Sequence, residues 1–239
     1  DVVAVLVEPV LGEGGVFVPH DDYLPRLRAL CDKHQWLLML DEIQTGMGRT
    51  GRWFAHQHAD LLPDVMTLAK ALGNGVPIGA CLARGRAAEV LKPGSHGSTF
   101  GGHPVAAAVA LRNLEVFEEE DLCGHVLRKE GEFRGMLEDL RDIPIVGDVR
   151  GAGFFHAIEL VKDRETKAAF DDEESEWLLR DFLSGEVFKN GLICRADDRG
   201  DPVIQLAPPL VSDTEQFEEI IGALRPVLEE ANHILEGRS

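Results

Sequence analysis

Residues 36–42 read WLLMLDE, and this stretch decides the fold class of the chain. Five consecutive apolar residues followed at once by two acids are typical of a strand that is buried on both faces of a parallel sheet. Residues 65–70, VMTLAK, repeat the pattern with a lysine in place of the acids. Ligands of open α/β sheets bind beyond the carboxyl ends of the strands. We therefore expect Asp41 and Lys70 to face one ligand-binding edge.

Strand-like and helical segments alternate outward from this stretch. The apolar runs 2–7 and 78–83 predict two further strands, and a helical pattern that begins after Asp22 separates the first strand from residues 36–42. This alternation predicts an α/β fold with a mostly parallel sheet. A buried parallel strand at residue 2 needs neighbours on both sides. We therefore expect the chain to begin inside a domain and to be a fragment of a longer protein.

The composition of the chain changes near residue 118, which predicts a second domain. We divide the chain into part of a large domain, residues 1–118, and a smaller α+β domain, residues 119–239. The second part combines charged helices, short strands and an amphipathic helix. Its expected elements are a strand near Val146, a helix through 178–187, strands at 192–195 and 203–206, and a last helix opened by the capping-box pattern of Ser212 and Glu215.

Charge and cysteine usage exclude several classes of function. The formal net charge is −18, from 24 basic and 42 acidic residues, so most of the surface would repel a nucleic-acid backbone. No apolar run is long enough to span a membrane, and the first residues lack the pattern of a secretory signal. The four cysteines lack C-x-x-C spacing, which is typical of buried free thiols. We expect a cytoplasmic protein that binds neither nucleic acid nor membrane.

Four motifs occur in a fixed order along the chain. They are EPV at 8–10, DEIQTGMGRTG at 41–51, PD at 63–64 ahead of Lys70, and STFGG at 98–102. Together these motifs resemble the class III, or ω-type, aminotransferases of the fold-type I superfamily that uses pyridoxal 5'-phosphate (PLP). The resemblance covers nearly the whole chain and implies the C-terminal portion of such an enzyme.

The resemblance implies a role for five residues. Asp41 would pair with the pyridine nitrogen of PLP, Ile43 would pack against the ring, and Gln44 would hydrogen-bond the phenolic oxygen. Lys70 would form the Schiff base with PLP and move a proton to and from the substrate carbon. Thr99 would bind the cofactor phosphate of the partner subunit, which implies a homodimer with shared active sites. PLP acts as an electron sink that the protein holds and orients.

Two positions bear on the substrate. Family members that bind α-amino acids or 2-oxoglutarate carry an arginine just before an A-P segment, and Gln205 stands at that position here. Members that accept amines and pyruvate resemble this chain at Arg195, which can bind a carboxylate through two hydrogen bonds. The resemblance implies transamination of an amine or ω-amino acid with a 2-oxo acid acceptor such as pyruvate. A surface arginine at the end of a strand is the equally weighted alternative.

Other interpretations remain open from the sequence. Asp41 and Lys70 could form a structural ion pair, as acids and lysines at strand ends often do. A mutase, racemase or decarboxylase of the same fold would use the same residues. The chain could also be a non-catalytic fragment, because the N-terminal half of the family's site has no match here. We expect no metal site, since His56 and His58 lack a third ligand nearby.

Overall fold

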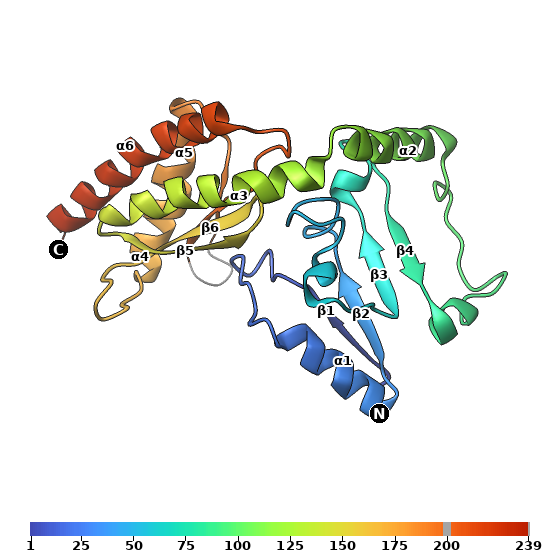
Figure 1. Cartoon of the computed structure of the whole chain (residues 1–239). Coiled ribbons are helices and arrows are strands. Elements are labelled where there is room, and N and C mark those ends of the chain that lie inside the picture. Colours follow the sequence, from blue (N-terminus) through green and yellow to red (C-terminus); the bar gives the residue numbers. More distant parts are fainter. Residues whose placement is uncertain (198–201, 239) are drawn as a thin grey trace. The chain divides into compact units, whose positions relative to one another are not determined.

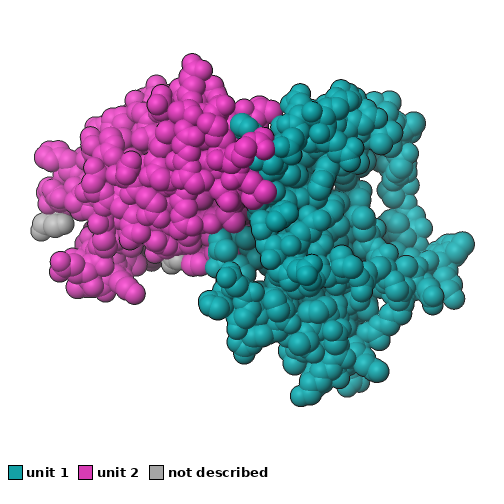
Figure 2. Space-filling model, viewed as in Figure 1, with its two compact units in different colours: residues 1–11, 18–126 teal, residues 12–17, 127–239 magenta. Residues whose placement is uncertain are grey.

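The computed structural model of the chain describes residues 1–197 and 202–238 and divides into two compact units (Figures 1 and 2). Unit 1 comprises residues 1–11 and 18–126. Unit 2 comprises residues 12–17 together with the described residues from 127 on. The short segment 12–17 therefore packs with residues that lie far later in the chain. The domain boundary expected at residue 118 stays a prediction.

Unit 1 is built on a four-stranded sheet in the order β1-β2-β3-β4. The first three strands are parallel to one another and β4 is antiparallel to β3. This sheet confirms the predicted α/β fold with mostly parallel strands. The strands are β1 (Ala4–Val7), β2 (Leu37–Asp41), β3 (Val65–Leu68) and β4 (Ala80–Ala83).

Helix α1 (Tyr23–His34) covers one face of this sheet (Figure 1). Leu38 and Leu40 of β2 are fully buried, and because their positions alternate along the strand they point to the same face. They form one apolar cluster with residues of α1, and neighbouring residues of β1 pack against it. The members are Leu24, Cys31, Leu38 and Leu40, with Val5, Val7, Leu27, Trp36, Ala59 and Leu61 at the margin.

The two edge strands of the sheet are more exposed than the sequence predicts. Leu6 of β1 is 61% exposed, although an apolar run of six residues predicts a strand buried on both faces. Cys81 of β4 is exposed, so the expectation of buried thiols is wrong at this position. In both cases the physical reason is the same, because each strand has a hydrogen-bonded neighbour on one side only.

Unit 1 also contains a longer helix, α2, and several short helical turns. Helix α2 (Pro104–Glu119) begins with the expected proline in its first turn. Phe117 of this helix stacks on Trp53 with 5.4 Å between the ring centroids. This contact connects α2 to the glycine-rich segment that follows β2, residues 43–54. Three short 3-10 helices complete the unit: η1 (Ala55–Ala59), η2 (Lys70–Leu72) and η3 (Gly85–Glu89).

Unit 2 contains an antiparallel sheet whose described strands follow the order β5-β6-β8-β7. Mixed helices and an antiparallel sheet confirm the predicted smaller α+β part. The third strand in sequence begins at Arg195, three residues later than expected. The strands are β5 (Val146–Ala152), β6 (Phe155–Leu160), β7 (Arg195–Asp197) and β8 (Val203–Leu206).

An aromatic cluster fills the core of unit 2. Phe133 stacks on Phe217 at 4.6 Å, and Phe154 meets Phe217 edge to face at 5.3 Å. All three side chains are fully buried and come from different segments of unit 2.

No described helix is long and apolar enough to cross a lipid bilayer. The helices are α3 (Leu122–Glu138), which starts in unit 1, η4 (Asp139–Asp142), α4 (Asp172–Glu176), η5 (Trp177–Leu183), α5 (Ser184–Lys189) and α6 (Thr214–Arg238).

The last helix begins one residue later than its capping pattern predicts. The backbone N–H of Asp213 donates to the side chain of Gln216 at 3.0 Å, and Thr214 donates its N–H to the Asp213 carboxylate at 2.7 Å. The capping pair is therefore Asp213 and Gln216, rather than Ser212 and Glu215. An aspartate accepts such bonds at least as well as a serine, which explains the shift.

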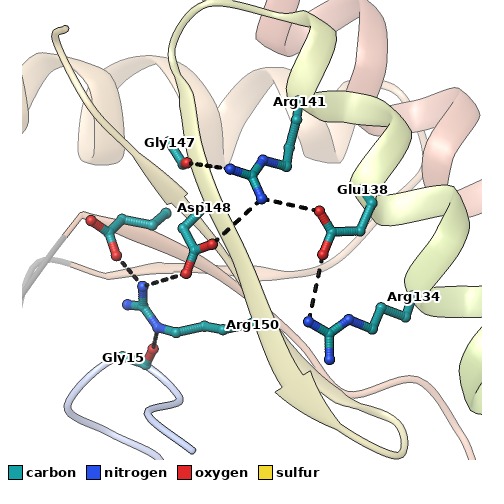
Figure 3. Close-up of polar contacts among 8 residues, drawn as sticks. Gly15, Arg134, Glu138, Arg141, Gly147, Asp148 and Arg150 are labelled. Carbon is teal, nitrogen blue, oxygen red and sulfur yellow. Dashed lines mark hydrogen bonds and ion pairs between the residues drawn. The ribbon is translucent and has the colours of Figure 1, made fainter. Parts of the chain in front are cut away.

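Arginine 150 holds the segment 12–17 in unit 2 (Figure 3). Its Nε donates to the carbonyl of Gly15 at 2.9 Å, and its guanidinium lies 4.0 Å from the ring centroid of Phe17. The same guanidinium pairs with Glu159 and with Asp148. Arg150 thus ties a loop that follows β1 to strands β5 and β6.

Candidate functional site

The candidate site starts at the carboxyl ends of β2 and β3. Asp41 is the last residue of β2 and pairs in register with Thr67, three residues before Lys70. Because β2 and β3 are parallel neighbours, both strands end at the same edge of the sheet. Asp41 and Lys70 form no ion pair within the described part of the chain. The structural ion pair considered from the sequence is therefore not the arrangement found.

Asp41 is oriented by its own backbone. Its Oδ1 accepts a hydrogen bond from the N–H of Ile43 at 2.9 Å, a local turn that aspartate favours. Among the described residues, no hydrogen bond or ion pair reaches its second carboxylate oxygen. The side chain is half-buried. Asp41 thus presents a fixed acceptor oxygen at the sheet edge that is available to a cation.

Glu42, the next residue, anchors the glycine-rich segment. Its side chain is 1% exposed and accepts hydrogen bonds from the backbone N–H groups of Ala55 and His56 at 3.0 and 2.9 Å. The hydroxyl of Thr45 donates to one carboxylate oxygen, and Nδ1 of His56 lies 3.0 Å from the other. Burial alone would raise the pKa of Glu42, but these four hydrogen bonds hold it below its usual value.

The sequence did not point to a role for Glu42, and its partner His56 was considered only as a metal ligand that lacked a third ligand nearby. The sequence signal for Glu42 is its position as the second of two acids at the end of an apolar strand. A carboxylate that is buried there requires hydrogen-bond donors nearby. His58 is also satisfied by protein groups, since its Nε2 lies 2.9 Å from the carbonyl of Thr50. The described residues contain no group of three potential metal ligands. In this structure His56 contacts Glu42 and His58 contacts Thr50.

Lys70 lies in a strained turn directly after β3. Its φ is +44°, a left-handed conformation that is uncommon for a residue other than glycine and concentrates at functional sites. The carbonyl of Lys70 accepts hydrogen bonds from the N–H groups of Gly73 and Asn74 at 3.1 and 3.2 Å. The side chain is exposed beside a pocket of about 570 Å³ that residues 69–71 and 74–78 line.

The other cofactor-binding residues expected from the sequence lie in unit 1 with Asp41 and Lys70. Ile43 and Gln44 follow Asp41 and are half-buried at the start of the glycine-rich segment. Thr99 lies in the exposed segment before α2, and no hydrogen bond or ion pair with another described residue involves it. The structure thus groups Asp41, Ile43 and Gln44 and leaves Thr99 on the surface of the single chain.

Arg195 belongs to unit 2 and lies directly opposite Gln205, because the two residues are register partners on β7 and β8. Nη1 of Arg195 is 2.7 Å from the carboxylate of Glu13, and the amide of Gln205 donates to the carbonyl of Gly12 at 3.5 Å. Both side chains thus contact the segment 12–17. In this structure Arg195 therefore forms an ion pair with a carboxylate of the chain itself.

Comparisons with known proteins agree with this geometry. Residues 1–228 match the family model described as aminotransferase class III. The acetylornithine aminotransferase of Corynebacterium efficiens is 44% identical over 232 residues, which are 97% of this chain and 52% of that protein. The putrescine–pyruvate aminotransferase of Pseudomonas aeruginosa is 40% identical over 235 residues, covering 96% of this chain and 50% of that protein.

A solved structure is similar over the same range. The ornithine aminotransferase of Toxoplasma gondii, whose active site is partly occupied by PLP, superposes with a TM-score of 0.84 at 34% identity. The match covers 98% of this chain and 52% of that one. The chain thus spans about half the length of the relatives it matches. Since the family model covers nearly all of its residues, this chain belongs to the class III aminotransferases.

Proposed function

We propose that the protein transfers an amino group from an amine or ω-amino acid to a 2-oxo acid such as pyruvate, with PLP as cofactor. One observation carries the proposal. Asp41 and Lys70 follow neighbouring parallel strands at one edge of the sheet and do not neutralise each other within the described residues. An acid and an amine in this arrangement are available to a third partner, whereas a structural pair would not be.

The residues at this edge fit PLP. An open pocket of about 570 Å³, formed by residues 69–71 and 74–78, lies beside Lys70. Asp41 offers an oxygen without a described partner, which suits a protonated ring nitrogen. Lys70 offers an exposed amine, which suits the aldehyde of the cofactor. When bound, PLP supplies an electron sink for a carbanion next to the amino group.

Four residues of the chain would then hold and orient the cofactor. Asp41 would pair with the ring nitrogen in its charged form, and Ile43 and Gln44 would orient the ring through packing and a hydrogen bond. Lys70 would hold the cofactor through its amine and would move a proton at the substrate carbon. A positioned base of this kind commonly contributes about 100-fold to 10,000-fold in rate.

Two further roles complete the proposal. Thr99 of the partner subunit would bind the cofactor phosphate, which requires a homodimer and a dimeric mass in sedimentation. Arg195 would bind the carboxylate of the 2-oxo acid. The similarity to a putrescine–pyruvate aminotransferase supports this acceptor, whereas the similarity to an acetylornithine aminotransferase leaves the amino donor to experiment.

The test is a screen of amino donors with pyruvate on the purified protein supplied with PLP. Turnover should appear with amines or ω-amino acids and should fall by at least about a thousandfold in Lys70→Ala, because the nucleophile is lost. Lys92→Ala, an exposed lysine of the same unit, is the matched control and should keep wild-type turnover.

Two negative results of this screen would have different meanings. A protein that takes up PLP but isomerises or decarboxylates its substrate contradicts transamination and supports another reaction of the same fold. A protein that shows no visible absorbance band with added PLP, before or after the lysine change, contradicts the cofactor assignment. That second result would favour the non-catalytic interpretation.

A further inference from the structure

Helix α2 contacts the turn that presents Lys70. The side-chain amide of Asn113 donates to the carbonyl of Ala71 at 2.7 Å and to the carbonyl of Leu72 at 3.3 Å. Both carbonyls belong to η2, the 3-10 turn that starts at Lys70. Carbonyls at the end of a short helix lack partners within it, so a side chain must satisfy them. Asn113 performs this task from 41 and 42 residues away in sequence.

The turn has little freedom to relax. A Cβ added at Gly73 would lie 2.1 Å from the carbonyl oxygen of Val76 and 2.6 Å from the side chain of Ile78, so the backbone folds back tightly on itself. Lys70 and Asn74 both have φ values in the left-handed region, +44° and +43°. Strained residues persist only where the surrounding contacts determine their conformation.

The same face of α2 also contacts the glycine-rich segment. Phe117 lies four residues after Asn113, which places the two side chains one helical turn apart on one face. Phe117 stacks on Trp53, in the segment that follows Asp41. One helix face therefore contacts both the turn of Lys70 and the loop that begins at Asp41.

We propose that Asn113 is a positioning residue for Lys70, and that its two hydrogen bonds hold the backbone of Lys70 in the left-handed conformation that presents the amine. The importance of that amine rests on the proposed function, but the effect on the turn does not. Without Asn113 the turn opens, and the carbonyl of Lys70 loses its bonds to the N–H groups of Gly73 and Asn74.

The first measurement needs no cofactor. Amide hydrogen exchange at Gly73 and Asn74 should accelerate by about fivefold to tenfold in Asn113→Ala, which corresponds to the loss of one or two hydrogen bonds. The control is Asn232→Ala on α6, where the side-chain amide donates to Glu236 of the same helix at 2.9 Å, far from the turn in sequence. It should leave both amides unchanged. Unchanged exchange at Gly73 and Asn74 in Asn113→Ala would overturn the proposal.

A second measurement separates positioning from general loosening. The visible absorbance band that appears when PLP is added should develop about tenfold more slowly in Asn113→Ala, while amides of unit 1 that open locally away from the turn keep their wild-type exchange rates. An equal increase of exchange at every amide of unit 1 would show a merely structural role and contradict the proposal. If Asn113→Ala does not fold, Asn113→Asp keeps the shape, removes both donors and decides the matter by the same readouts.

The two proposals fail separately. A wild-type protein that does not bind PLP through Lys70 refutes the proposed function, whereas hydrogen exchange at Gly73 and Asn74 still decides whether Asn113 holds the turn. Faster exchange with an unaltered rate of PLP uptake would refute the positioning of the amine.

Discussion

A buried glutamate in unit 1 and a buried histidine in unit 2 are kept in opposite charge states. In unit 1, Glu42 is buried under the glycine-rich segment and keeps a lowered pKa because four donors surround its carboxylate. In unit 2, His156 is equally buried beside Phe133, and burial lowers its pKa to about 4, so it stays neutral. The charged carboxylate of Glu42 therefore lies next to Asp41 in unit 1, whereas His156 in the core of unit 2 is uncharged.

The difference agrees with the site proposed in unit 1. Charge, strained backbone and a pocket occur together after β2 and β3 of unit 1. Unit 2 has an interlocked aromatic core and pairs the partly buried Arg141 and Arg150 with acids (Figure 3). We expect changes in unit 1 to alter reactivity and changes in unit 2 to alter stability or substrate preference.

The largest expected effect concerns His156. Its folded pKa of about 4 lies below its ordinary value of 6.5, so the unfolded state binds the proton first as the pH falls. The stability of unit 2 should be complete above pH 6.5 and should decline by about 3 kcal/mol between pH 6.5 and 4. Trp177, the tryptophan of unit 2, can report urea unfolding once Trp36 and Trp53 are replaced.

His156→Gln provides the comparison for this prediction. It keeps an N–H donor for the carbonyl of Gly153, which Nε2 of His156 contacts at 2.8 Å, but it does not titrate. The decline with pH should therefore flatten in this variant. His233→Gln, an exposed histidine of α6, should preserve the wild-type slope. A wild-type slope in His156→Gln would show that another group causes the acid sensitivity.

A smaller effect is expected at Glu42. Glu42→Gln removes the charge and places an NH₂ group against N–H donors, which should cost unit 1 about 2 kcal/mol of unfolding free energy. Since the folded pKa is lowered, this contribution is present above the ordinary value of 4.5 and disappears as the pH falls through the folded pKa. Urea unfolding at neutral pH checks the loss, with Trp36 and Trp53 as reporters.

The control for Glu42 is Glu89→Gln, an exposed glutamate of unit 1 that should change stability by less than about 0.5 kcal/mol. Equal losses of unfolding free energy in Glu42→Gln and Glu89→Gln would mean that the buried hydrogen bonds of Glu42 do not stabilise unit 1. The contrast between the units would then disappear.

The smallest effect is expected at Arg195. Its ion pair with Glu13 is partly exposed, at 38% and 44% for the two side chains, so Arg195→Ala should change stability very little. If Arg195 binds the acceptor carboxylate, the KM for pyruvate should rise by about 10-fold to 100-fold while simple amines are hardly affected. Steady-state kinetics with both substrates checks this, and equal losses for both would exclude the carboxylate role.

Much of the fold could be predicted because its signals are local. The apolar runs that end at Asp41 and at Lys70 predicted two strands with these residues at their carboxyl ends, and the structure shows that β2 and β3 are parallel neighbours. Burial at the sheet edges could not be predicted, because Leu6 reads like any core residue until its strand is seen to have one neighbour. The helix cap at Asp213 was missed because Ser212 matches the same pattern.

For the candidate site as well, local features could be predicted from the sequence and long-range contacts could not. Sequence by itself determined the family, the strand ends and the residue types at positions 41 and 70, because periodicity and motif spacing depend on neighbouring residues. Only the tertiary structure decided that Glu42 is clamped by residues 13 and 14 positions later and that Asn113 reaches the turn of Lys70 from a helix 42 residues away. Such contacts depend on how the packed helices and strands meet in space. The number of residues between two positions does not reveal the distance between their side chains.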